Sequence, residues 1–274
     1  MKNLKNKVAV VTGAGSGIGR ELAVELAALG CHLAISDVNE KGLTQTAAML
    51  NGASVNVTTH ILDVSDRDAF YVHANEVKKA HSKVDIVINN AGVAMGSTLE
   101  NTTFEDFEWV MGINFWGVVY GTKAFLPMLR ESKDANLVNV SSINGIVPSP
   151  TGGPYACSKY AVRAFTETLM MEIKDSNINF SVVHPGGIKT NISRDARFRM
   201  DDVLSHQEMT EVFETKIFRL TANEAARIII KGIQKNKQRI MVGSDAKFLD
   251  RFRRLAPMLS LKIIGNSVSK MMGV

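Results

Sequence analysis

Tyr155 and Lys159 lie four residues apart in a segment whose pattern predicts a helix, so both side chains project from one helical face. The phenol of a free tyrosine has a pKa of about 10, too high for a base near neutral pH. A neighbouring ammonium, together with the positive charge of an oxidised nicotinamide, would stabilise the phenolate and lower that pKa. The pair therefore suits a residue that takes up and releases a proton during a reaction.

Two hydroxyls precede this pair in the sequence. Ser141 and Ser142 follow the apolar run 137–140, so we expect them at the carboxyl edge of a sheet, where cofactor and substrate meet in α/β folds. Ser142 precedes Tyr155 by 13 residues, a loop long enough to bring both hydroxyls onto one substrate oxygen. Asn114 is a polar residue inside an otherwise apolar helical segment, and alone it would be interpreted as a hydrogen-bonded core residue.

A glycine-rich turn separates the first predicted strand from the first predicted helix. Its sequence is Thr12-Gly13-Ala14-Gly15-Ser16-Gly17-Ile18-Gly19. Glycines allow a tight turn and a close approach to a pyrophosphate, and the helix N-terminus behind them offers unpaired N–H groups. In this position the turn indicates a dinucleotide site.

Asp37 stands at the end of the second predicted strand, 18 residues beyond Gly19. A carboxylate there can accept hydrogen bonds from both adenine-ribose hydroxyls and would repel a 2′-phosphate. A site for that phosphate would favour Arg or Lys at Ser16 or Val38, and neither residue is basic. The sequence therefore predicts NAD rather than NADP.

Short β-branched runs alternate with longer helical patterns along the chain. Strands are predicted at 8–11, 32–36, 57–62, 84–89, 136–140, 180–184 and 239–242. Helices are predicted at 19–29, 40–50, 66–81, 103–129, 155–173 and 222–234. Continuously apolar strands suit a parallel sheet covered on both faces, and strand–helix alternation predicts a doubly wound α/β sheet of about seven strands. The absence of a linker in the sequence predicts a single domain over residues 1–274.

Six motifs follow one another in a recognisable order. They are TGxxxGxG at 12–19, Asn89-Asn90-Ala91-Gly92, the helical Asn114, Ser142, YxxxK at 155–159, and Pro185-Gly186. With these motifs the chain resembles the short-chain dehydrogenase/reductase family in its single-domain, Rossmann-fold form. The resemblance spans residues 12–190 and implies an NAD(H)-dependent oxidoreductase that interconverts a secondary alcohol and a ketone or aldehyde by hydride transfer.

The resemblance also implies a role for each matching residue. Tyr155 would be the general acid/base, and Lys159 would lower its pKa and bind the nicotinamide ribose. Ser142 would hold the substrate oxygen, and Asn114 would hold a water that links Lys159 to solvent. The implied cofactor site comprises Gly13, Ser16, Gly17, Ile18, Gly19, Asp37, Asp63, Val64, Asn90, Ala91, Gly92, Tyr155, Lys159, Pro185, Gly186, Ile188 and Thr190.

Three parts of that implied site have distinct positions around the cofactor. Asp63 and Val64 would border the adenine. Asn90 would stabilise the sheet beside the cofactor. The segment after the sixth strand would line the nicotinamide, with Ile188 and Thr190 meeting its carboxamide.

Composition disfavours several other classes. The formal net charge of +5 comes from scattered Lys and Arg, which argues against nucleic acid binding. Cys31 and Cys157 form no CxxC or Cys/His pattern, and the His, Asp and Glu residues show no ligand spacing, so we expect no disulfide and no metal. The first apolar run is only Val8 to Val11, too short for a signal peptide, and no 18-residue apolar stretch exists. A cytoplasmic protein is expected.

The substrate is the least determined feature. Residues 189–220 form the least regular stretch and are expected to be the substrate loop. Their apolar residues favour a medium-sized apolar alcohol or ketone, whereas Arg194, Arg197 and Arg199 could face a carboxylate or CoA, or simply solvent.

The C-terminal tail, residues 247–274, begins with a basic amphipathic segment that Pro257 interrupts. Such a segment can lie on a membrane, cover the pocket or pack against another subunit, and we favour packing in a homodimer or homotetramer. Three alternatives to the main interpretation stay open. They are an NADPH-dependent carbonyl reductase, a non-catalytic NAD-binding module, and a peripheral membrane or scaffold protein.

Overall fold

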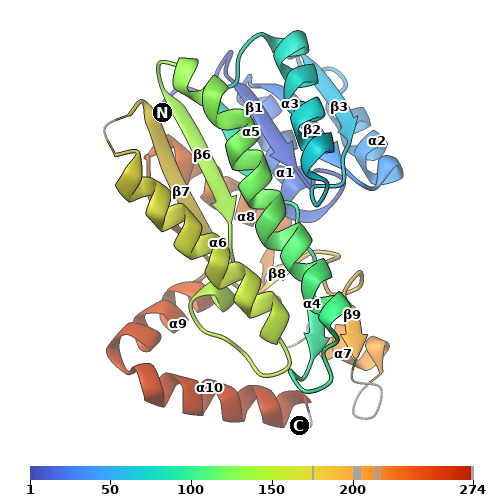
Figure 1. Ribbon diagram of the computed structural model, residues 1–274, viewed down its shortest axis with the longest axis vertical. Helices are drawn as coiled ribbons and strands as arrows, with labels where there is room; N and C mark the ends of the chain where they lie inside the picture. Colours follow the sequence, from blue (N-terminus) through green and yellow to red (C-terminus); the bar gives the residue numbers. More distant parts are fainter. Residues whose placement is uncertain (175, 200–204, 213–214, 216, 273–274) are drawn as a thin grey trace.

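A seven-stranded parallel sheet forms the centre of the computed structural model, which describes residues 1–174, 176–199, 205–212, 215 and 217–272 (Figure 1). The strand order is β11-β7-β6-β4-β1-β2-β3. The strands are β1 (Val8–Thr12), β2 (His32–Asp37), β3 (Val57–Ile61), β4 (Ile86–Asn89), β6 (Ala135–Val140), β7 (Ile178–Pro185) and β11 (Arg239–Val242). All seven predicted strands are present, and the predicted fold class is confirmed.

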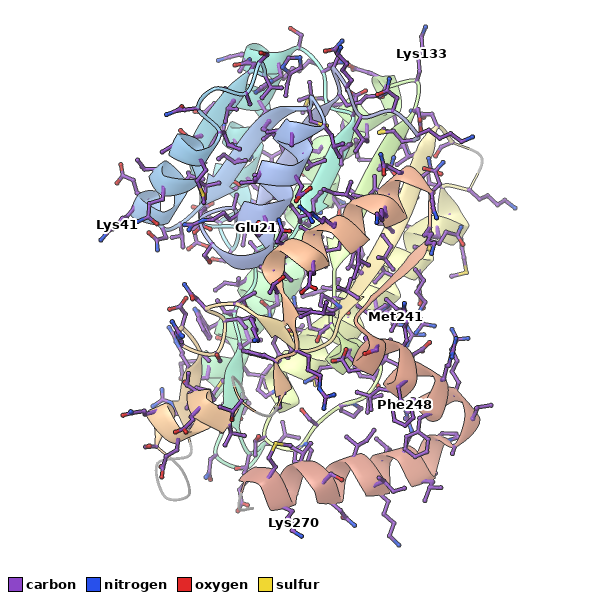
Figure 2. The ribbon with its side chains drawn as sticks, turned by 180° about the vertical axis from the view of Figure 1, so that it is seen from behind. Glu21, Lys41, Lys133, Met241, Phe248 and Lys270 are labelled. Atoms are coloured by element: carbon purple, nitrogen blue, oxygen red, sulfur yellow. The ribbon has the colours of Figure 1, made fainter. Side chains whose placement is uncertain are left out.

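Helices cover both faces of this sheet, because every central strand is apolar on both sides. One face carries α1 (Gly17–Ala28), α2 (Glu40–Met49) and α8 (Ala222–Gln234), whose buried side chains share one core cluster. The other carries α3 (Arg67–His81), α5 (Gly117–Glu131) and α6 (Gly153–Glu172), which share a second cluster. Seen from behind in Figure 2, α8 lies beside α1, and Asn223 donates to Glu21 across their contact.

The sheet order reverses direction between β1 and β4, which creates a crevice at the carboxyl ends of these strands. The turn after β1 and the segment after β4 meet there. The carboxyl ends of the strands point toward the lower half of Figure 1, where the remaining elements lie. This edge is where the predicted site residues come together.

The predicted helix over 103–129 is interrupted. It consists of α4 (Phe104–Met111), a π-helical turn η1 (Gly112–Trp116) and α5. A π-turn inserts one extra residue into the helix and is often found at functional sites. Asn114 lies in this turn and is fully buried.

Further elements build the lower half of the molecule, and apart from the two helices of the tail the sequence did not predict them. They are β5 (Met95–Ser97), η2 (Ile143–Gly145), β8 (Ile188–Lys189), β9 (Arg197–Arg199), α7 (His206–Val212), β10 (Leu220–Thr221), α9 (Ser244–Leu255) and α10 (Pro257–Met272). β5 pairs with β9 and β8 pairs with β10, so two-stranded ladders hold both ends of the predicted substrate loop. Positions 200–204, 213, 214 and 216 of that loop lie outside the described residues.

The tail folds as two helices, with the break at Ala256 immediately before Pro257. The interruption predicted at Pro257 is therefore confirmed. Within the part of the chain that the structure describes, no helix has the length and apolar character needed to cross a membrane.

Candidate active site

The glycine-rich turn is fastened to the segment that follows β4. The Thr12 hydroxyl accepts hydrogen bonds from the backbone N–H groups of Asn90 (3.0 Å) and Ala91 (3.1 Å). The Asn90 amide in turn donates to the carbonyls of Thr12 (2.9 Å) and Gly13 (3.2 Å). Gly13 adopts φ +67°, and a Cβ there would lie 2.7 Å from the Ala91 Cα, so only glycine fits. These contacts fix the backbone conformation of the glycine-rich turn at the N-terminus of α1.

Asp37 lies against the same turn from the end of β2. Its Oδ2 accepts the Gly15 N–H at 2.8 Å and its Oδ1 accepts the Asn39 N–H at 2.8 Å. Arg20 supports the turn from the other side. Its guanidinium donates to the carbonyls of Gly15 and Gly42 and to the side chains of Gln45 and Thr46. The nearest Arg on α1 is therefore already committed to backbone and side-chain acceptors.

Ser142, Tyr155 and Lys159 come together at the carboxyl end of β6. Ser142 follows that strand and Tyr155 stands in the first turn of α6, so that the Ser142 hydroxyl lies beside the Tyr155 phenol. The Lys159 ammonium lies 5.6 Å from the centre of the Tyr155 ring and donates to the Val140 carbonyl at 3.1 Å. The structure thus brings together the three residues that the sequence placed 13 and 4 positions apart.

Asn114 fastens the π-turn to the segment after β4. Its Oδ1 accepts the Val93 N–H at 2.8 Å, and its Nδ2 donates to the Val93 carbonyl at 3.0 Å and to Ser158 Oγ at 3.1 Å. A Cβ on Gly92 would lie 3.0 Å from Asn114 Oδ1 and 3.2 Å from Lys159 Nζ. Asn114 and Lys159 are therefore neighbours on either side of Gly92.

The segment Pro185–Thr190 closes the crevice from the β7 side. A Cβ on Gly17 would lie 3.1 Å from Thr190 Cγ2, so this segment touches the glycine-rich turn. Asp245 at the start of α9 accepts the Gly187 N–H at 2.8 Å. A cavity of about 320 Å³ opens beside the segment and is lined by Lys189, Thr190, Asn191, Arg194 and Phe218.

The expected adenine-bordering pair lies after β3. The Asp63 carboxylate accepts hydrogen bonds from the Ser65 N–H (2.9 Å) and hydroxyl (2.6 Å). Val64 is buried, and a Cβ on Gly117 would lie 2.9 Å from Val64 Cγ2. Val64 therefore packs on α5, while Asp63 stabilises the turn that leads to α3.

Comparisons with known proteins identify the family to which the chain belongs. The family model described as short chain dehydrogenase matches residues 7–201. The chain belongs to the short-chain dehydrogenase/reductase family. The SadH protein of Mycobacterium tuberculosis, which carries the name of an oxidoreductase, is 38% identical over 272 residues, covering 98% of both chains. Like its relatives in the family, this chain is an oxidoreductase.

Two solved structures of the family bear on the cofactor. A short-chain dehydrogenase/reductase from Burkholderia phymatum in complex with NAD superimposes with a TM-score of 0.87 at 29% identity, covering 94% of this chain and 96% of that one. An alcohol dehydrogenase from Thermococcus sibiricus complexed with 5-hydroxy-NADP gives a TM-score of 0.74 at 27% identity, covering 87% and 96%. The family fold therefore accepts both nicotinamide dinucleotides.

Burial is the largest cause of the pKa shifts of Tyr155 and Lys159. It raises the pKa of the Tyr155 phenol, an effect that the hydrogen bond from Ser142 partly offsets. Burial also lowers the pKa of the Lys159 ammonium to about 8. Burial thus opposes ionisation of the phenol, and additional positive charge next to the ring would favour it.

Two of the three arginines in the predicted substrate loop are engaged within the protein. Asp106, a buried residue of α4, accepts from Arg199 Nε at 2.9 Å and from Arg197 Nη1 at 3.3 Å. The Arg197 guanidinium also stacks 3.7 Å from the centre of the Trp109 ring. Arg197 and Arg199 thus anchor β9 to α4. Of the three arginines, Arg194 lines the cavity.

Sequence reasoning missed several residues that position this oxidoreductase site. Thr12, Arg20 and Asp245 act through the contacts given above. His184, interpreted from the sequence as an ordinary strand residue, is fully buried, and its Nδ1 donates to the Ser142 carbonyl at 2.9 Å. Burial lowers the pKa of His184 to about 4, so this neutral ring fixes the backbone beside Ser142. Only the position of Thr12 directly before Gly13 gave a signal in the sequence.

Proposed function

We propose that this enzyme uses NAD(H) to interconvert a secondary alcohol and a ketone or aldehyde, with Tyr155 as the proton-transfer residue. The observation that carries the proposal is the meeting of Ser142 and Tyr155 at one site, with the Lys159 ammonium 5.6 Å from the centre of the phenol ring. Two hydroxyls that lie beside each other at the carboxyl edge of the sheet can both reach one substrate oxygen. This arrangement polarises that oxygen without a metal ion.

The proton path follows from the same contacts. NAD, when bound, supplies the hydride acceptor and adds positive charge near the phenol. Ser142 orients the substrate hydroxyl, and Tyr155 removes its proton as the carbinol C–H bond breaks, so the carbon becomes a carbonyl. Lys159 stabilises the phenolate, and Asn114, its neighbour across Gly92, holds a water that returns the proton to solvent. The reverse sequence reduces the carbonyl.

Asp37 supports NAD over NADP. Its carboxylate lies at the turn, hydrogen-bonded to the Gly15 N–H, where it would repel a 2′-phosphate. Arg20, the nearby cation on α1, already donates to four acceptors, and Val38 is exposed and apolar. The NAD-bound relative agrees with this choice, whereas the relative bound to 5-hydroxy-NADP keeps an NADPH-dependent reductase as the alternative.

An apolar substrate fits the surface next to Tyr155. Leu99 lies against Gly153, two residues before Tyr155, and is 65% exposed. Engagement of Arg197 and Arg199 by Asp106 removes two of the cations that could have bound a carboxylate or CoA. A medium-sized secondary alcohol or ketone is therefore the proposed class.

We extend the proposal to the organisation and location of the protein. The whole chain folds as one domain and works in the cytoplasm as a homodimer or homotetramer. Support comes from the exposed apolar side chains Phe248, Leu255 and Met258 on α9 and α10, which suit packing against another subunit. Light scattering on the eluted protein tests the subunit number, and vesicle flotation tests the membrane alternative.

Activity with both dinucleotides tests the proposed chemistry. We would follow absorbance of the reduced nicotinamide over a panel of secondary alcohols, for the wild type, Tyr155→Phe and the exposed control Tyr71→Phe. Turnover with NAD should fall by about 10²–10⁴-fold in Tyr155→Phe and stay unchanged in the control. Full activity of Tyr155→Phe would refute the assignment, and tight NAD binding with no turnover on any alcohol or ketone would favour the non-catalytic module.

A further inference from the structure

Three side chains with metal-binding atoms meet between β3 and α3, at the upper right of Figure 1, away from the candidate active site. His60 comes from the edge strand β3, and His73 and Glu76 lie one turn apart on α3. One ligand atom from each lies within 4.8 Å of the other two. We infer that this cluster, the His60–His73–Glu76 site, binds a divalent transition metal ion of the zinc class.

The imidazole of His73 lacks a hydrogen-bond partner within the described part of the chain. The residue is 3% exposed, and neither its Nδ1 nor its Nε2 has a partner among the described residues. Buried polar atoms are nearly always paired, so an imidazole with two unpaired nitrogens needs an explanation. A neutral imidazole carries one N–H and one free lone pair, and that lone pair is what binds a metal. A bound metal would satisfy one of these nitrogens.

The two ring nitrogens of His60 have the contacts expected of a metal-ligating histidine. Its Nδ1 lies 3.0 Å from Glu76 Oε2, and its Nε2 lies 3.0 Å from Thr58 Oγ1. Thr58 Oγ1 is also 3.0 Å from His81 Nε2. When Nε2–H donates to Thr58 and Thr58 donates to His81, the Nδ1 lone pair is left for a metal. Ligating histidines usually have such a partner on the other ring nitrogen.

The spacing of the ligand atoms fits a small cation after a modest adjustment. Zinc bonds of about 2.0–2.2 Å to nitrogen and oxygen place tetrahedral ligands roughly 3.4 Å apart. The His60–Glu76 pair is already at 3.0 Å, and the Glu76 side chain is 55% exposed, so its carboxylate can adjust to a bound ion. Two imidazoles and one carboxylate favour zinc or a similar first-row ion over Mg²⁺ or Ca²⁺, and leave one position for water.

Such an ion would tie the edge strand β3 to α3, so its expected effect is on stability rather than on hydride transfer. From the sequence we expected no metal, because no ligand spacing was recognised among its His, Asp and Glu residues. Packing of β3 against α3 creates the ligand set. The inference does not depend on the proposed dehydrogenase chemistry.

Zinc titration of the full chain after chelator treatment tests the site. Competition with a chromogenic chelator would give the affinity, elemental analysis the stoichiometry, and thermal unfolding with and without zinc the stabilisation. The variants are His60→Gln, Glu76→Gln and His73→Phe; the last suits the ring contacts that His73 makes with Phe70 and Phe125. His32→Gln, on the neighbouring strand β2, is the matched control.

We expect one zinc per chain, zinc-dependent stabilisation, and affinity at least about 100-fold weaker in each ligand variant but unchanged in the control. Glu76→Gln alters an exposed side chain, so it keeps the test valid if a buried variant fails to fold. Sub-stoichiometric binding by the wild type would overturn the inference. Wild-type zinc affinity in both Glu76→Gln and His60→Gln would do the same, since the zinc would then lie elsewhere.

Discussion

Replacing Asp37 with asparagine is expected to move the cofactor preference of this enzyme toward NADP. The substitution removes one negative charge but keeps an amide oxygen that can accept the Gly15 N–H, now 2.8 Å from Oδ2, while the exposed Asn39 N–H, which Oδ1 accepts, would bond to water. The glycine-rich turn should therefore keep its shape. The variant isolates the electrostatic role of the carboxylate from its structural role.

The magnitude follows from the two interactions that change. Hydrogen bonds to a charged acceptor are stronger than neutral ones by about 1 kcal/mol each, so losing the charge opposite two ribose hydroxyls weakens NAD by about 2 kcal/mol. A carboxylate and a phosphate about 5 Å apart repel by about 1 kcal/mol in water and about 3 kcal/mol at an effective dielectric of about 20. Relief of this repulsion strengthens NADP by about 2 kcal/mol. The ratio of the two affinities should shift by about 4 kcal/mol, roughly a thousandfold.

Fluorescence titration with NADH and NADPH measures both affinities without knowledge of the substrate. Asp63→Asn is the matched control, because Asp63 lies in the expected adenine site and should change both affinities alike. A shift of less than about tenfold in the ratio for Asp37→Asn would refute the reasoning. Asp37 would then be only a turn residue that accepts the N–H groups of Gly15 and Asn39, and the NADPH-dependent alternative would gain.

The protein's buried polar groups allow three further predictions. Asn114→Ala should lower the free energy of unfolding by about 2–4 kcal/mol in urea titrations, because it leaves the Val93 N–H and carbonyl unpaired; a loss below about 1 kcal/mol would contradict this. Burial lowers the pKa of Lys159 from 10.5 to about 8, so between these pH values the side chain is protonated in the unfolded chain and neutral in the folded one. The cost of burying its charge therefore lowers the stability fully below pH about 8 and disappears as the pH rises toward 10.5. Lys159→Met should therefore stabilise the fold by up to about 3 kcal/mol below pH about 8 and by little near pH about 10, and a pH-independent difference would argue against it. Iodoacetamide should label the exposed Cys157 and not Cys31, whose thiol pKa burial raises to about 12, and peptide mass spectrometry that finds equal labelling would show that Cys31 opens to solvent.

Much of the fold could be predicted because its signals are local. Each central strand is a short, continuously apolar run, and each run is followed by a helical pattern, which leaves the parallel sheet as the arrangement that buries both faces. Asp66, where the sequence predicted the start of a helix, is the N-cap of α3, and its side chain accepts from the N–H groups of Asp68 and Ala69. Short ladders such as β5–β9 were not predicted, since three-residue strands carry no period and depend on a partner about a hundred residues away.

The sequence by itself determined which chemical groups stand at the ends of the strands: the glycine-rich turn after β1, Asp37 after β2, Ser142 after β6, and Tyr155 and Lys159 one helical turn apart. These positions follow from strand–helix alternation, a property of neighbouring residues. Only the tertiary structure decided what each group touches. It set the π-turn around Asn114, the engagement of Arg197 by Asp106, and the meeting of His60 with His73. Burial also raised the pKa of Tyr155, because desolvation depends on every element packed around the ring and on no spacing along the chain.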